Sequence, residues 1–110
     1  MWKFSVVLFF TLLSVVPLRA ETITLLALGD SLTAGYGLDP TQSFPVKLET
    51  ALKSKGHDVM IVNAGVSGDT TAQAAARLDW SLTDDVDAVL VELGANDALR
   101  GLPVPQAEAA

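Results

Sequence analysis

The sequence predicts an α/β fold in three layers, built on a doubly wound parallel sheet with the strand order 2-1-3. Three short apolar runs, at residues 23–28, 59–62 and 86–93, are nearly continuous, as strands buried on both faces of a parallel sheet are. Two segments with helical spacing of apolar residues separate these runs, so strands and helices alternate along the chain. The sheet is expected to be truncated after its third strand, with the remaining strands missing.

The first helical segment lies between the first two runs. Its helix is expected to begin near Ser43, with Pro45 in the first turn, and to stop at Gly56. The residues expected to form its buried stripe recur at intervals of four: Phe44, Leu48 and Leu52.

The second helical segment lies between the second and third runs. Thr70 with Gln73 three residues later is a capping box, which predicts the start of this helix. Arg77 and Asp79 are expected to point outward from it. The residues expected to point inward are Ala74, Ala75, Leu78 and Leu82.

The N-terminus has the layout of a secretory signal peptide at residues 1–20. Lys3 lies near the start, an apolar stretch follows at residues 4–16, and Ala20 supplies a small residue after which cleavage is expected. The apolar stretch is shorter than the ~20 residues of a membrane-spanning helix, so no stable membrane anchor is expected. These features predict export, with a bacterial periplasm as the destination.

The amino-acid composition argues against nucleic acid as a partner and excludes sites that need cysteine. The 110 residues, half of them hydrophobic, have room for one small domain with a folded core. Removing residues 1–20 lowers the number of Lys and Arg residues from 7 to 5 against 13 acidic ones, and such an acidic chain does not suit nucleic acid. Because the chain contains no cysteine, disulfides and thiolate metal sites are excluded.

Each apolar run is followed by a polar turn. The three turns are Gly29-Asp30-Ser31-Leu32, Ser67-Gly68-Asp69-Thr70 and Gly94-Ala95-Asn96-Asp97. The carboxyl ends of the strands in a parallel sheet meet at one edge, where ligands and catalytic groups gather. The sequence therefore predicts that these turns form a single site.

Ser31 is the candidate nucleophile of this site. A serine hydroxyl needs a base to take its proton and donors to stabilise the oxyanion that forms on attack. The backbone N–H groups of Ser31 and Gly68, with the side-chain amide of Asn96, would supply three such donors. Asp30 is expected to form a hydrogen bond back across the turn and hold it rigid.

Other sites fit the sequence less well. The nucleophile elbow of α/β-hydrolases needs Gly-x-Ser-x-Gly, but Thr33 stands two residues after Ser31. The glycine spacing of a dinucleotide-binding turn and the Gly-Lys-Ser/Thr of a phosphate loop are also absent. Asp30, Asp69 and Asp97 lack support from His or Cys, so no metal site is expected there.

The three polar turns resemble the first three sequence blocks of the SGNH (GDSL-type) hydrolases, and the similarity spans residues 24 to about 106. The resemblance implies a flavodoxin-like sheet, with Ser31 as nucleophile and with Gly68 and Asn96 completing the oxyanion hole. It also implies that Asp97 supports the turn that aims Asn96. The implied reaction needs no metal or cofactor and hydrolyses small-molecule acyl esters or thioesters, as an arylesterase, lysophospholipase or acyl-CoA thioesterase, through an acyl-serine intermediate.

The fourth block of that family, Asp-x-x-His, is not present in this sequence. The only histidine is His57, which precedes the second strand and is expected in a surface turn at the opposite edge of the sheet from Ser31. Residues 21–110 are therefore expected to be the N-terminal part of an SGNH-hydrolase domain, inactive by itself. A carbohydrate O-deacetylase of the same superfamily and a non-catalytic domain that binds an anion with the same donors are the alternatives.

Overall fold

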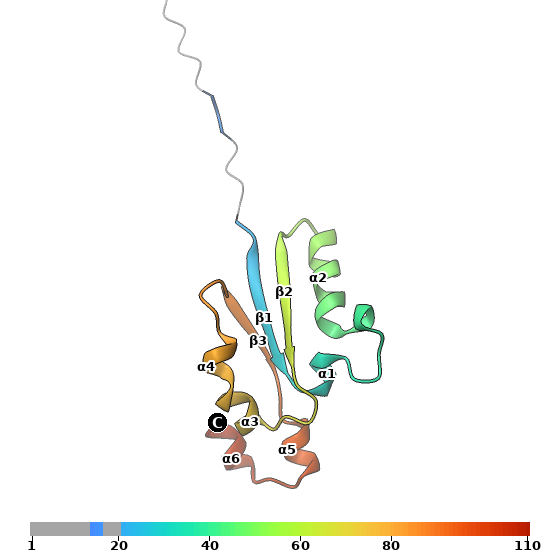
Figure 1. Ribbon diagram of the computed structural model, residues 1–110, viewed down its shortest axis with the longest axis vertical. Coiled ribbons are helices and arrows are strands. Elements are labelled where there is room, and N and C mark those ends of the chain that lie inside the picture. The colour runs from blue at the N-terminus through green and yellow to red at the C-terminus, as the bar shows by residue number, and fades with distance from the viewer. Residues whose placement is uncertain (1–13, 17–20) are drawn as a thin grey trace, which may run out of the picture.

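The computed structural model describes residues 14–16 and 21–110 (Figure 1). The expected signal peptide, residues 1–20, lies outside the described residues except for its positions 14–16. Within the described ranges, no helix has the length and apolar character needed to cross a membrane.

Three parallel strands form the sheet: β1 (Ile23–Gly29), β2 (Val59–Gly65) and β3 (Ala88–Glu92). Their order is β2-β1-β3, which confirms the order predicted from the sequence. β3 is shorter than the apolar run at residues 86–93 that predicted it.

The register of the sheet places the ends of the three strands at the same level. Gly29, the last residue of β1, pairs with Gly65 at the end of β2 and with Glu92 at the end of β3. The three polar turns therefore leave the sheet side by side from one edge, as the sequence predicted.

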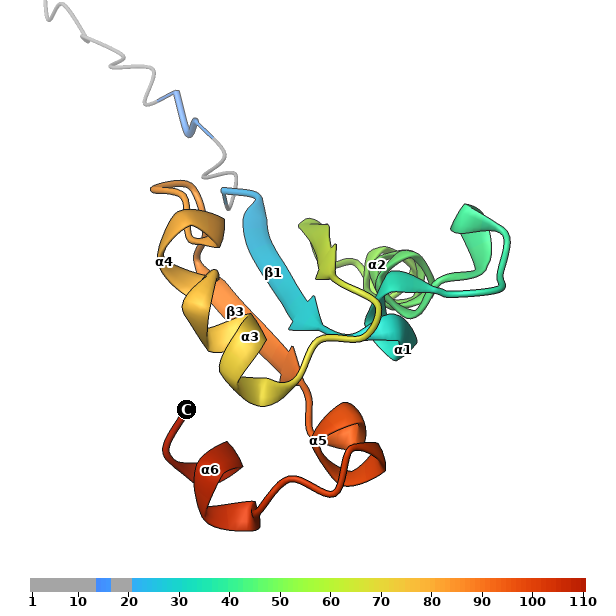
Figure 2. The ribbon, with the colours of Figure 1, turned by 60° about the horizontal axis from the view of Figure 1, so that its bottom comes forward.

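Short helices connect and cover the strands. They are α1 (Ser31–Ala34), the 3-10 turn η1 (Pro40–Gln42), α2 (Phe44–Ser54), α3 (Thr71–Ala76), α4 (Leu78–Ser81), α5 (Ala95–Leu99) and α6 (Val104–Glu108). Figure 2 shows α2 on one side of the sheet and α3 with α4 on the other, which is the doubly wound arrangement.

The core lies on the central strand β1 and the residues that cover it. β2 and β3 were predicted to be buried on both faces but are mostly half-buried or exposed, because they are the outer strands of the sheet and the described helices cover them only in part. Leu28 and its β3 partner Val91 face α3 and α4, whereas Leu90 and Glu92 face α1 and the start of α2. Among the residues that the structure describes, the buried hydrophobic ones are Leu26, Ala27, Leu28, Val59 and Ala74.

The first helix differs from the prediction at one position of its buried stripe. Pro45 is buried in the first turn of α2 as expected, and Leu48 and Leu52 are half-buried. Phe44 was expected to be buried but is 44% exposed. It is the first residue of α2 and lies at the rim of an open cavity, so only one side of its ring is covered.

The second helix also differs, because it is broken in two at Arg77. α3 ends at Ala76 and α4 begins at Leu78, and the prediction of one continuous helix with Arg77 pointing outward is wrong. The guanidinium turns inward to two acceptors at the carboxyl edge of the sheet. Of the four residues expected to point inward, Ala74 is buried and Leu78 half-buried, whereas Ala75 and Leu82 are exposed.

Candidate active site

Ser31 is the first residue of α1 and lies directly beyond the carboxyl end of β1. Asp30 is the N-cap of this helix, and its Oδ1 accepts a hydrogen bond of 2.9 Å from the Leu32 N–H. Such a cap contributes ~1 kcal/mol to the stability of a helix. The side chain of Asp30 is fully buried, and the hydrogen bond expected across the turn of Ser31 is present.

The turn of Ser31 packs closely against the ends of β1 and β2, through backbone atoms at Gly65 and through the Thr33 side chain at Gly29. A Cβ atom at Gly65 would lie 2.3 Å from the backbone N of Ala34, and one at Gly29 would lie 2.1 Å from Thr33 Oγ1. Val66 N–H donates to the Gly29 carbonyl at 2.9 Å. Glycine at both strand ends thus lets α1 sit against the sheet edge.

Gly68 lies in the turn that follows β2 and has a φ of +88°, a left-handed conformation that favours glycine. Its carbonyl oxygen accepts a hydrogen bond of 2.6 Å from Arg100 Nη2. Asn96 Nδ2 donates to the carbonyl of Asp69 at 3.0 Å. Because an amide carries two N–H groups, this bond orients Asn96 and leaves its second N–H for a ligand.

Asp97 joins the third turn to the start of α3. Its side chain is 5% exposed, and Oδ2 accepts hydrogen bonds from Thr71 N at 2.8 Å and Thr71 Oγ1 at 3.0 Å. Thr70, the N-cap of α3, forms the predicted capping box with Gln73. The helix that follows the Gly68 turn is thus anchored to the segment that carries Asn96.

Arg77 joins the first and second turns. Its Nε lies 2.7 Å from Asp69 Oδ2 and its Nη2 lies 3.1 Å from the Gly29 carbonyl oxygen. The two side chains are 11% and 13% exposed, so this ion pair is largely shielded from water. Sequence analysis missed this role of Arg77. The only available signal was an opposite charge at Asp69, eight residues earlier.

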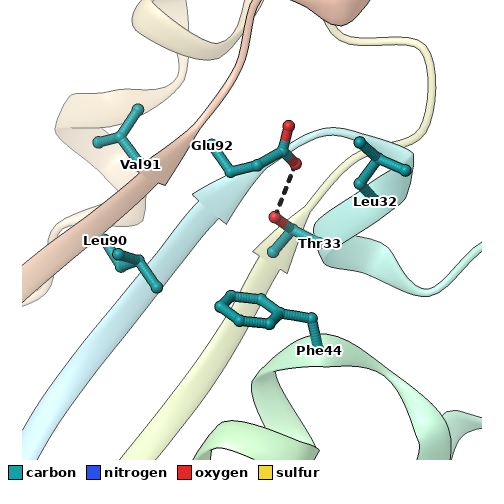
Figure 3. Close-up of a pocket in the computed structure, with 6 residues that line it drawn as sticks. All are labelled: Leu32, Thr33, Phe44, Leu90, Val91 and Glu92. Atoms are coloured by element: carbon teal, nitrogen blue, oxygen red, sulfur yellow. Dashed lines mark hydrogen bonds between the residues drawn. The ribbon is translucent and has the colours of Figure 1, made fainter.

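Glu92 is a second residue of the site that the sequence analysis did not single out. Thr33 Oγ1 donates to Glu92 Oε1 at 2.9 Å (Figure 3). Burial raises the pKa of the Glu92 carboxyl above its usual value, and the neighbouring Asp30 carboxylate raises it further. Thr33 and Glu92 line an open cavity of about 340 Å³. The other residues that line it are Leu32, Phe44, Leu90 and Val91.

His57 lies at the opposite edge of the sheet. It precedes β2, so it stands at the amino end of the parallel strands, whereas Ser31 follows the carboxyl end of β1. His57 is exposed in the turn after α2, and its backbone N–H donates to the Leu52 carbonyl. The prediction that His57 is a surface residue remote from Ser31 is confirmed.

The structure thus brings Ser31, Gly68 and Asn96 to one edge, within turns that are bonded to one another. Within residues 14–16 and 21–110, no group of three or more His, Cys, Asp or Glu side chains is placed to hold a metal ion. The backbone N–H groups of Ser31 and Gly68 and the side-chain amide of Asn96 are neutral donors at this edge, and such donors suit an oxygen that carries or develops negative charge.

Proteins with similar sequences and structures include several that are described as esterases or thioesterases. An arylesterase from Vibrio mimicus is 49% identical over 100 residues, which are 90% of this chain and 48% of the relative. The thioesterase 1/protease 1/lysophospholipase L1 of Escherichia coli (strain K12) is 46% identical over 90 residues, which are 81% of this chain and 42% of the relative. The chain therefore spans about half the length of the curated relatives it matches.

The crystal structure of AlinE4, an esterase of the SGNH-hydrolase family, superimposes with a TM-score of 0.77 at 51% identity. This match covers 83% of the present chain and 50% of AlinE4. The family described as GDSL-like Lipase/Acylhydrolase matches residues 27–110, a range that includes all three polar turns. The chain belongs to this family of hydrolases.

Proposed function

We propose that the full-length gene product is a serine esterase or thioesterase that works through an acyl-serine intermediate. The observation that carries this proposal is the joining of three turns at one sheet edge. Asn96 bonds to Asp69, the neighbour of Gly68, and Arg77 bonds both to Asp69 and to Gly29, two residues before Ser31. These bonds connect the turns that carry Ser31 and the three proposed donors, which supports their action as one group.

In the proposed reaction, Ser31 Oγ attacks the carbonyl carbon of the ester and loses its proton to a general base. The oxyanion that forms accepts hydrogen bonds from the N–H groups of Ser31 and Gly68 and from the Asn96 amide. The C–O or C–S bond then breaks, and the leaving alcohol or thiol takes the proton from the base. Water, activated by the same base, hydrolyses the acyl-serine and releases the acid.

The general base is proposed to lie outside these 110 residues. A base must come within hydrogen-bond reach of its nucleophile, and His57 stands at the wrong edge of the sheet. Because the chain spans about half the length of its curated relatives, the remaining part of a full-length domain is the expected source of an Asp-x-x-His motif.

The proposed substrates are small-molecule acyl esters and thioesters. Support comes from the relatives, whose names describe an arylesterase and a thioesterase that is also a lysophospholipase. The donor set of the site acts on the carbonyl group, which these substrates share, so it does not by itself separate an alcohol from a thiol leaving group.

Export is proposed from the N-terminal sequence, with cleavage after Ala20. The mature protein is then expected to begin at Glu21 and to accumulate in a periplasm. N-terminal sequencing of the protein recovered from a periplasmic fraction checks this. A recovered protein that still begins with residues 1–20 would contradict the proposed cleavage.

Covalent labelling tests the proposed function directly. A fluorophosphonate reacts with a serine whose proton is taken by a base, and it does not react with a serine that only caps a helix. We expect the full-length protein to be labelled on Ser31, as identified by mass spectrometry of its peptides. Ser67, in the neighbouring turn, serves as the internal control and is expected to remain unlabelled. Absence of label on Ser31 would favour a binding domain instead.

A further inference from the structure

Two carboxyl groups, those of Asp30 and Glu92, are neighbours at the turn that carries Ser31, because Asp30 directly follows Gly29, the residue that pairs with Glu92 in the sheet. Asp30 is 0% exposed, and its Oδ1 accepts from the Leu32 N–H. Its second oxygen, Oδ2, is buried and has no hydrogen-bond partner among the described residues. Glu92 comes to the same place from the end of β3, and its Oε1 accepts from Thr33 Oγ1 (Figure 3).

A buried carboxylate oxygen without a donor is costly, and two ionised carboxylates side by side repel each other. The hydroxyl of Thr33 has one proton, which it donates to Glu92, so Thr33 cannot also serve Asp30. A protonated carboxyl carries one O–H donor. A single proton on Glu92 therefore removes the repulsion between two carboxylates, and it supplies a hydrogen-bond donor for Asp30 Oδ2.

We propose that Glu92 holds a proton at neutral pH and donates it as a hydrogen bond to Asp30 Oδ2, so that Glu92 acts as a positioning residue for Ser31. Each carboxyl oxygen of Asp30 then has a donor, the Leu32 N–H on Oδ1 and the Glu92 O–H on Oδ2. Because Asp30 immediately precedes Ser31, this bond fixes the backbone N–H of the proposed nucleophile. The importance for catalysis rests on the proposed function, whereas the position of the proton does not.

The surroundings of Glu92 agree with this assignment. Burial is the largest cause that raises the pKa of Glu92, and the hydrogen bond and charge of Asp30 raise it further. The Thr33 hydroxyl and the Asp30 backbone N–H act in the opposite direction without reversing it. Arg77, which reaches this sheet edge from the junction of α3 and α4, is bonded to Asp69 and Gly29 instead.

Infrared spectroscopy of the full-length protein tests where the proton is. At neutral pH we expect a carboxylic-acid C=O band that shifts when glutamate is labelled with ¹³C. The band should be absent from Glu92→Gln and present in Ser31→Ala, in which the carboxyl pair is intact. A missing band in the wild type, or one that persists in Glu92→Gln, would overturn the proposal, whether or not the protein hydrolyses esters.

The pH dependence of stability gives a second test. Since folding raises the pKa of Glu92 above its ordinary 4.5, the stability that its proton contributes is complete below pH 4.5. This stability is lost as the pH rises through the folded-state pKa. The difference in unfolding free energy between wild type and Glu92→Gln should therefore fall as pH increases above 4.5. Glu108→Gln, an exposed control on α6, should retain the pH dependence of the wild type, and a flat or rising difference for Glu92→Gln would contradict the proposal.

The rate of fluorophosphonate labelling at Ser31 shows whether Glu92 positions Ser31 through its hydrogen bond to Asp30 or only fills space beside it. Glu92→Gln keeps a donor for Asp30 and an acceptor for Thr33, so it should be labelled at a rate close to that of the wild type. Glu92→Leu has a similar size but no donor, and its labelling should slow by roughly tenfold, the loss expected for one hydrogen bond to a charged group. Equal rates in the two variants would overturn the positioning role. If wild-type Ser31 is not labelled at all, the proposed function fails, and the infrared band still decides the position of the proton.

Discussion

Replacing Ser31 with alanine is expected to abolish hydrolysis of a short-chain aryl ester by the full-length protein. The substitution removes the hydroxyl at the first position of α1, directly after β1, at the edge shared with Gly68 and Asn96. Without a nucleophile no acyl-serine can form, and the oxyanion donors alone leave only a small residual rate. The measurement is the release of the aryl alcohol, followed by absorbance, with circular dichroism to confirm folding.

His57→Ala is the matched control for this experiment. His57 is exposed at the amino edge of the sheet, so its removal should leave hydrolysis almost unchanged. A loss as large as that of Ser31→Ala would show that the base lies within these 110 residues and that its proposed location is wrong. Unchanged activity in Ser31→Ala would refute the assignment of the nucleophile itself.

Asn96→Ala is expected to lower kcat by about 100- to 1,000-fold, the usual effect of losing one oxyanion donor. KM should change little, because the donor interacts most strongly with the charge that develops in the transition state. The structure supports this role, since the bond from Asn96 Nδ2 to the Asp69 carbonyl fixes the amide beside the Gly68 turn. Steady-state kinetics with the aryl ester provide the measurement.

The Asn96→Asp variant distinguishes the loss of the N–H donor from the loss of side-chain volume. Aspartate has nearly the same size as asparagine but, when ionised, offers only acceptors. It should therefore be at least as impaired as Asn96→Ala, and recovery of kcat in Asn96→Asp would contradict the donor role. Equal unfolding free energies of wild type and Asn96→Ala would show that the loss of rate does not come from unfolding.

The fold could be predicted from the sequence because its strands follow a simple physical rule. The strands of parallel sheets are typically continuous apolar runs, and right-handed connections between them then leave few possible orders. The capping box at Thr70 and the brace at Asp30 were also predictable, because both depend on residues within three positions of each other. Local chemistry of this kind is visible in a sequence.

The contacts that tie the site together were not predictable in the same way. Arg77 bonds to the Gly29 carbonyl across 48 positions, and Thr33 bonds to Glu92 across 59. A charged residue in a helical segment is usually a solvated one, so the pattern favoured an outward Arg77. Only the register of the sheet, which sets Gly29 beside Glu92, brings these partners together.

The close packing of Gly65 against α1 has a consequence for how such a site can change. Main-chain atoms make this contact, and they have no rotamers with which to adjust. The separation between the serine turn and the turn that follows β2 is therefore set by the spacing of paired strands, about 4.8 Å, and not by side-chain packing. Substitutions of the side chains around the cavity can therefore change its shape, whereas the spacing between these two turns stays fixed by the sheet.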